Sequence, residues 1–393
     1  MRALVHLSTY WFFLFAAMGV FFPYYSLYLR ETAGLGGTQI GLVLATLPLV
    51  GIATQPLWGI WADRTGARRG VVALLAAGSA VCLGILSLAR GFWEILLATG
   101  ALALFFASLV PLSYSLTLAF LAGRGPRAFG YVRVWGTVGF LLLAVGFPRF
   151  SAGLSLSTAH AGSSTAPGLE ALFWVAAALL GVASFVATRL PSVPELSLRA
   201  RPGEWRLLLR HPAMRRLFLF VLLAYFCLQG PMVLLPIYVT SRGGDMATVG
   251  DLWLLMLLVE IPLVLFSGLG LERIGARGLL AVGVAFGGAR WFVCGLAESW
   301  TLVYAVQLFH GLVVAGLLLG GPLYVEAVAP PELRASGQAL LSTVGVSLGG
   351  ILSNTTSGVL LDVRGIDLPY VAGGLGALVL GLSARFFLPR PER

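Results

Sequence analysis

The chain has 393 residues, of which 58% are hydrophobic and only 11% are charged, and its mean hydropathy is +0.92. These values exclude a soluble globular domain and predict a protein that crosses a membrane several times. The net charge of +10 comes from 26 basic residues that are all arginine, and their distribution, given below, argues against nucleic acid as a partner.

Apolar stretches long enough to cross a bilayer recur along the whole sequence, since about 20 residues span the hydrocarbon core. They predict an all-α membrane protein with twelve transmembrane helices in two six-helix bundles. The predicted spans are 8–29, 38–62, 70–89, 95–120, 128–148, 169–190, 213–240, 247–271, 278–297, 299–326, 335–361 and 366–388. The first span contains Pro23 and is too long for a signal-peptide core, so we expect it to be retained.

A segment rich in proline and charge at 191–211 separates the N-terminal bundle, 1–190, from the C-terminal bundle, 212–393. Residues 204–210 within this linker predict either a short helix at the membrane interface or an ordinary polar linker.

Arginine is unevenly distributed between the predicted loops. If the N-terminus is cytoplasmic, the outer arginines are only Arg30, Arg90, Arg149, Arg242 and Arg364, while Arg133 and Arg290 lie within spans. This positive-inside bias predicts a multi-pass protein of the cytoplasmic (inner) membrane with both termini in the cytoplasm.

A charged motif occurs twice, as GIWADRTGAR from Gly59 and as GLGLERIGAR from Gly268, 209 positions later. Val20-x-x-Pro23-x-Tyr25 is similarly echoed by Val233-x-x-Pro236-x-Tyr238, so the halves are parallel repeats. Each motif predicts a tight cytoplasmic turn in which glycine lets helix ends approach and charged side chains hold a gate shut; the alternative is a plain basic loop. The predicted gating residues are Gly59, Asp63, Arg64, Gly66, Arg68, Arg69, Gly268, Glu272, Arg273, Gly275 and Arg277.

Three ionisable residues of the second half, Glu260, Arg290 and His310, lie within predicted spans. At about 1.5 Å per residue they are roughly 18 to 24 Å from the inner surface, close to the bilayer midplane. Charge there is costly and usually marks a pathway. An acid, a base and an imidazole that exchange partners could load and release a proton; the alternative is a static Glu260–Arg290 pair that only fixes packing.

The motif GIWADRTGARR and the parallel six-plus-six arrangement resemble the major facilitator superfamily. Phe22-Pro23, Gln55-Pro56-Leu57-Trp58-Gly59 and the stretch 129–136, FGYVRVWG, are similar to the branch that contains lactose permease and the 3-phenylpropionate permease. The resemblance implies alternating access and a coupling role for Glu260, Arg290 and His310. The branch's proton-carrying glutamate is Val313 here, so we expect Glu260 to be the proton carrier.

The same resemblance implies solute binding at Arg133 and at Phe140, which stands at the position of a sugar-stacking tryptophan. The helix-four stretch PLSYS at 111–115 lacks the acid that pairs with this arginine in the branch. An arginine without an acid favours an anionic ligand; the alternative is a side chain that snorkels to the headgroups. Tyr24 and Tyr28 either line the solute entrance or belong to the interfacial aromatic belt.

These observations predict a secondary transporter that imports a small organic anion, such as an aromatic carboxylate, together with protons. The alternatives are sugar or nucleoside symport with protons, and efflux of a drug or metabolite by proton antiport. No GxxxxGK loop, metal-ligand spacing or catalytic triad stands out, so we expect no cofactor, no metal site and no enzyme activity. A receptor with this fold is a further alternative. The expected partners are the solute, protons and the bilayer, with the chain acting as a monomer.

Overall fold

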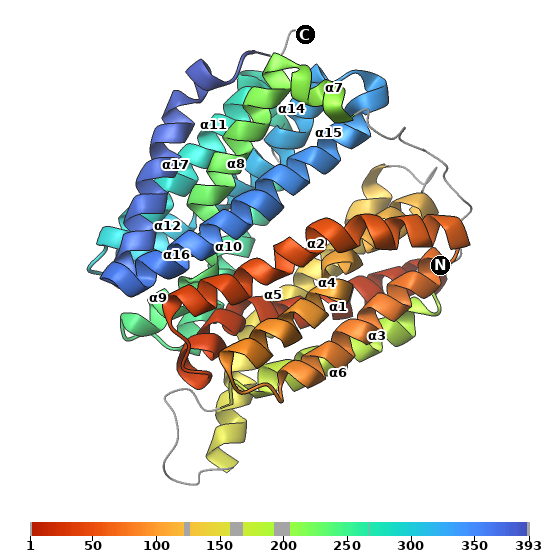
Figure 1. Ribbon diagram of the computed structural model, residues 1–393, viewed down its shortest axis with the longest axis vertical. Coiled ribbons are helices and arrows are strands. Elements are labelled where there is room, and N and C mark those ends of the chain that lie inside the picture. The colour runs from red at the N-terminus through yellow and green to blue at the C-terminus, as the bar shows by residue number, and fades with distance from the viewer. Residues whose placement is uncertain (1, 122–125, 158–167, 192–204, 266, 391–393) are drawn as a thin grey trace. The chain divides into compact units, whose positions relative to one another are not determined.

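The computed structural model describes residues 2–121, 126–157, 168–191, 205–265 and 267–390; within these ranges the side chains of 126–127, 152–157, 205 and 264–273 are left undescribed. All secondary structure of the described residues is helical (Figure 1). Among the described residues, eleven helices are long and apolar enough to cross a membrane, and a shorter apolar helix spans Ala171–Ala187. The twelve predicted spans are therefore present, and the predicted fold class is confirmed.

The chain folds into two compact units: Met1–Ser197 with Arg242–Asp251, and Leu198–Ser241 with Leu252–Arg393. The first unit's helices are α1 (Arg2–Leu27) with the π-helical turn η1 (Tyr28–Thr32), α2 (Gly37–Thr65), α3 (Arg68–Leu86), α4 (Phe92–Leu121), α5 (Pro126–Ser157) and α6 (Ala171–Ala187). Within this unit α1 packs against α5 and α6, α3 packs against α4 and α6, and α2 packs against α4 (Figure 1).

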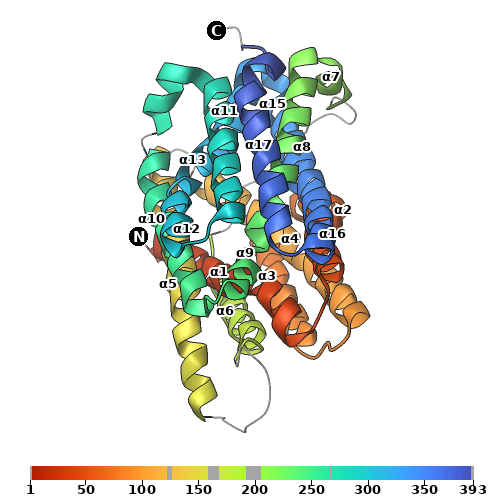
Figure 2. The same ribbon diagram turned by 90° about the vertical axis from the view of Figure 1, so that its left-hand side faces the viewer.

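The second unit is more interrupted, and its helix α10 (Met246–Leu265) begins with residues that belong to the first unit, up to Asp251. Its elements are α7 (Trp205–Arg210), α8 (Pro212–Val233), α9 (Leu235–Ser241), α10 (Met246–Leu265), α11 (Ser267–Leu296), α12 (Trp300–Gln307), α13 (His310–Val314), η2 (Ala315–Gly320), α14 (Gly321–Val328), η3 (Pro331–Leu333), α15 (Arg334–Leu341), η4 (Ser342–Gly349), α16 (Gly350–Arg364) and α17 (Asp367–Phe387). Within the unit α17 packs along α11 and α8 (Figure 2). The π-helical stretches η2 and η4 fall inside the tenth and eleventh spans, and such stretches are frequent at functional sites.

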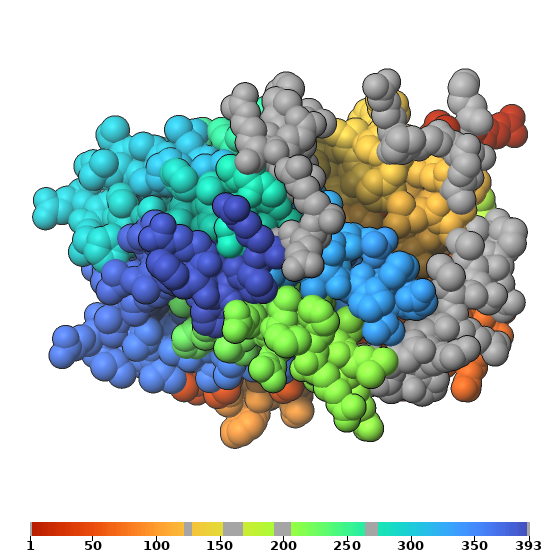
Figure 3. Space-filling view, turned by 90° about the horizontal axis from the view of Figure 1, so that it is seen from above, coloured from red at the N-terminus to blue at the C-terminus, as the bar shows by residue number. Residues whose placement is uncertain are grey.

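The predicted linker contains the short helix α7, which covers residues 205–210 of the segment 204–210; Glu204 lies outside the described residues. Leu208 is buried, whereas Leu207 and Leu209 are exposed. Figure 3 shows α7 and the start of α8, in green, beside the blue turn between α14 and α15, and these elements pack against one another. Residues 205–210 therefore form a short helix, as one of the two alternatives predicted. The position of this helix at the membrane interface stays a prediction.

Glycines allow a close helix approach between α11 and α17 of the second unit. A Cβ on Gly374 would collide with the backbone N and Cα of Phe292, and a Cβ on Gly288 would collide with the backbone N of Leu378. Backbones approach this closely only where both helices carry small residues.

We expect Gly374→Ala to destabilise the protein by about 1–3 kcal/mol, the usual cost of overpacking. The measurement is thermal unfolding of the purified protein in detergent. Gly181→Ala is the matched control, because no heavy atom lies within 4 Å of its added Cβ, and alanine is the better helix former. Equal melting temperatures for the two variants would show that the α11–α17 contact tolerates a wider spacing.

Candidate functional site

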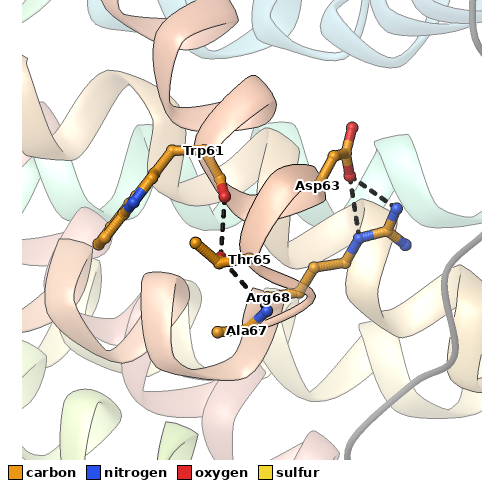
Figure 4. Close-up of polar contacts among 5 residues, drawn as sticks. All are labelled: Trp61, Asp63, Thr65, Ala67 and Arg68. Carbon is orange, nitrogen blue, oxygen red and sulfur yellow. Dashed lines mark hydrogen bonds and ion pairs between the residues drawn. The ribbon is translucent and has the colours of Figure 1, made fainter.

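The first copy of the repeated motif forms a self-contained turn after α2 (Figure 4). Gly66, with φ of 63°, ends the helix in the left-handed region. The Oδ1 atom of Asp63 accepts hydrogen bonds from Nε of Arg68 at 3.2 Å and from its Nη2 at 2.7 Å. The hydroxyl of Thr65 donates to the carbonyl of Trp61 at 2.8 Å. The turn is thus fixed by its own side chains, although the exposed carboxylate limits the strength of the pair.

The second copy turns at Gly275, whose φ of 69° matches that of Gly66. The structure therefore places the turn between the eighth and ninth spans at this glycine, after a helical stretch that we predicted to end at 271. Of the predicted gating residues, Gly268, Glu272 and Arg273 fall in the segment whose side chains are not described.

At Gly59, which we expected to let helix ends approach, no heavy atom lies within 4 Å of the Cβ it would carry. Gly59 lies inside α2, well before the turn, so the chain reversal does not need it. Arg64 is exposed.

Arginines of both motifs reach the end of the last helix of their own unit. Nη1 of Arg69 donates to the carbonyl of Leu190, after α6, at 3.2 Å. Nη1 of Arg277 donates to the carbonyl of Leu388, after α17, at 3.3 Å. The last carbonyls of a helix lack intrahelical donors, so these arginines tie the turn to the end of the bundle. The two residues differ by one position in the sequence repeat, and the sequence alone did not reveal this common contact.

The second unit gathers the three predicted ionisable residues into one polar cluster, built on Arg290 of α11. This side chain is 2% exposed. Its Nε donates to Oε1 of Gln307 at 2.8 Å, and its Nη1 lies 2.9 Å from Nδ1 of His310. On the far side of the imidazole, Nε2 of His310 lies 3.5 Å from Oε2 of Glu260. His310 therefore stands between the acid and the arginine, in place of the direct Glu260–Arg290 pair considered above.

The neighbours of His310 determine which of its ring nitrogens accepts. A guanidinium has only donors, so Nδ1, which faces Arg290, must accept the hydrogen bond. The proton of the neutral ring then sits on Nε2, which faces Glu260. The cluster is thus ordered: arginine donates to histidine, and the N–H of histidine faces the carboxylate of Glu260 across 3.5 Å.

A break in the tenth span brings His310 to this position. The α-helix α12 ends at Gln307 and α13 begins at His310, with Leu308 and Phe309 between them. The following residue, Gly311, lets α13 approach α10, because its Cβ would lie 3.0 Å from Cα of Glu260. A larger residue would separate the acid from the imidazole.

In the first unit, Arg133 lies among aromatic side chains of α1 and α4. Its Cζ is 3.8 Å from the ring centre of Phe15 and 5.1 Å from that of Trp11. Its Nε donates to the hydroxyl of Tyr114 at 2.9 Å. Its Nη1 is buried and has no hydrogen-bond partner. The side chain therefore stays within the bundle, and the snorkelling alternative does not describe it.

The other residues of the first unit that we predicted to contact the solute are Tyr24, Tyr28 and Phe140. Tyr24 is fully buried and donates to the carbonyl of Ala144. Tyr28 is 2% exposed and its ring meets that of Phe173 edge-on at 4.6 Å. The backbone of Phe140 approaches α1 at Gly19. For the tyrosines this burial favours neither alternative that we predicted, since both place the rings at a surface.

Comparison with known proteins identifies the chain. Residues 4–372 match the model of the MFS_1 like family. The chain belongs to this family. It is similar to the maltose permease of Geobacillus stearothermophilus, at 31% identity over 98% of this chain and 94% of the relative. It is also similar to the "Probable 3-phenylpropionic acid transporter" of Escherichia coli (strain K12), at 27% identity over 98% of each chain. The crystal structure of the nucleoside transporter NupG has the same fold, with a TM-score of 0.85, 18% identity, and coverage of 98% of this chain and 99% of that one.

The protein is therefore a multi-pass membrane transporter of the major facilitator superfamily and not an enzyme. The sequence reasoning missed one polar member of this transporter's cluster, Gln307, which is fully buried. Its amide also donates to the carbonyl of Val303 at 2.9 Å, so it holds Arg290 in place. The sequence could have indicated Gln307, because it is a polar residue in an otherwise apolar stretch. It also lies three positions before His310, on the same side of a helix.

Proposed function

We propose that this transporter imports a small organic anion, such as an aromatic carboxylate, together with protons. The observation that carries the solute class is the buried Nη1 of Arg133, which has no hydrogen-bond partner. A buried donor left unpaired costs about 1–3 kcal/mol, and more when it is charged. A carboxylate supplies the acceptor and the opposite charge that this guanidinium lacks.

The surroundings of Arg133 also suit an aromatic solute. The rings of Trp11, Phe15 and Tyr114 lie around its guanidinium. Aromatic groups stack readily on one another and on a guanidinium plane. An anion with a ring would contact both kinds of group.

Proton coupling is supported by the order of groups in the cluster of the second unit. A proton added to Nδ1 of His310 would place two donors face to face, since Nη1 of Arg290 lies 2.9 Å away. The protonated ring would separate from Arg290 and pair more strongly with Glu260. Protonation thus changes the partner of a buried arginine, and a change of that kind can be linked to a movement of helices.

The orientation follows from the distribution of arginine, which predicts both termini on the cytoplasmic side of the inner membrane. Protease cleavage of terminal tags in right-side-out and inverted vesicles tests this. Cleavage of either tag from the outside of intact cells would contradict it.

Sugar transport is the second candidate, because the maltose permease is 31% identical over 98% of this chain. Aromatic rings such as those of Trp11 and Tyr114 can also stack on a sugar. Nucleoside transport and efflux by proton antiport remain alternatives of the same superfamily fold.

The deciding experiment is uptake by proteoliposomes of labelled 3-phenylpropionate, maltose and uridine, with and without an inward proton gradient. We expect the gradient to stimulate 3-phenylpropionate uptake at least fivefold, and excess maltose to leave it unchanged. Uptake of maltose or uridine without uptake of 3-phenylpropionate would contradict the proposed anion and indicate a sugar or nucleoside as the solute. Stimulation by an outward gradient instead would indicate antiport.

A further inference from the structure

A cavity of about 190 Å³ lies within the second unit beside the polar cluster. Arg290 and His310 line it together with Met232, Trp291 and Val313. Most of its wall is apolar or aromatic, so a charge inside it is poorly screened by water. The cavity is smaller than the usual 300–1,000 Å³ of a pocket that encloses a whole drug-sized ligand. It therefore suits one end of a solute.

The guanidinium at this cavity has only neutral acceptors among its described contacts. These are the amide oxygen of Gln307 and the imidazole nitrogen of His310. The remaining nitrogen, Nη2, faces the sulfur atoms of Met256 at 3.1 Å and Met232 at 3.9 Å. Thioether sulfur is a weak acceptor, so Nη2 is the least satisfied edge of the guanidinium.

No described carboxylate contacts Arg290 directly. Glu260 lies beyond the ring of His310, and none of the ion pairs between described residues includes Arg290. Burial of a cation without a counter-ion is costly. Besides His310, the residues of α13 that line this cavity are Val313 and Val314, and neither carries a charge.

We propose that this cavity binds the carboxylate of the transported solute, which accepts from Nη2 of Arg290 in place of the two methionine sulfurs. The bound anion supplies a negative charge in direct contact with the guanidinium, which none of the ion pairs between described residues does. The face of the Trp291 ring, 3.8 Å from Cζ of Arg290, holds the guanidinium plane and leaves its edge for the carboxylate. This site rests on the proposed anion transport, and it names a carboxylate-binding group in the second unit.

The test uses a carboxylate supplied by the protein itself. Val313→Glu places an acid at the cavity wall, and Val313→Gln is its uncharged match in size. Binding of 3-phenylpropionate and of its neutral amide is measured by calorimetry on the purified full-length protein, with thermal unfolding as the check on folding. We expect Val313→Glu to bind 3-phenylpropionate at least tenfold more weakly than Val313→Gln does, with a ratio close to one for the amide.

Equal affinities of the two variants for 3-phenylpropionate would overturn the proposal while leaving anion transport intact. Failure of the wild type to bind carboxylates, combined with maltose binding, would instead overturn the proposed function and this site with it. If Val313→Glu does not fold, Arg290→Gln and Arg290→Lys take its place. We then expect at least tenfold weaker binding of 3-phenylpropionate by the glutamine variant than by the lysine variant, and equal affinities would overturn the proposal.

Discussion

Glu260→Gln is expected to lower gradient-driven accumulation of the solute at least tenfold, while solute exchange without a gradient persists. The amide keeps the size of the side chain and can still accept from Nε2 of His310, which lies 3.5 Å from the carboxylate in the structure. It cannot stabilise a protonated imidazole by charge, so the proton loses its binding place next to Arg290. The measurement is uptake into proteoliposomes with and without an imposed proton gradient, alongside counterflow.

Glu298→Gln is the matched control, because Glu298 is an exposed acid between α11 and α12 of the same unit. It should accumulate the solute like the wild type. If Glu260→Gln accumulates the solute as well as this control does, then the cluster is a static packing element, and Glu260 does not carry the coupled proton.

The second large effect is expected for Arg133→Gln, which should raise the KM for 3-phenylpropionate by about 10- to 100-fold. A hydrogen bond to a charged group contributes about 1.5–3 kcal/mol, and 1.4 kcal/mol corresponds to a factor of ten. The aromatic rings around the guanidinium remain in the variant, so the effect reports the charge. Initial rates of uptake over a range of concentrations measure it.

Arg189→Gln is the control for this measurement. Arg189 also stacks on an aromatic ring, that of Phe185 at 4.3 Å, but it is exposed at the end of α6. We expect it to leave the KM unchanged. A similar KM for both variants would remove Arg133 from the solute site and favour a neutral solute.

The amino-acid sequence was sufficient to predict the helices and the turns between them. Apolar length determines where a chain can cross a membrane, and the twelve predicted spans recur as helices with ends shifted by several residues. The repeated motif also predicted where the chain reverses, and the structure shows that its Gly66 and Gly275 both have positive φ. Such features depend on local composition and on the conformational freedom of single residues, so no knowledge of the rest of the fold was needed.

Only the tertiary structure decided which polar groups meet. The depth calculated from residue spacing placed Glu260, Arg290 and His310 near the bilayer midplane. It did not show which of them contact one another, and it gave no reason to include Gln307. Their order depends on the rotation of each helix about its axis and on the break between α12 and α13, which arise from packing between helices. The same holds for Arg133, whose aromatic neighbours come from α1 and α4. A hydropathy pattern reports how deeply a residue lies, whereas only packed helices determine which side chain it faces.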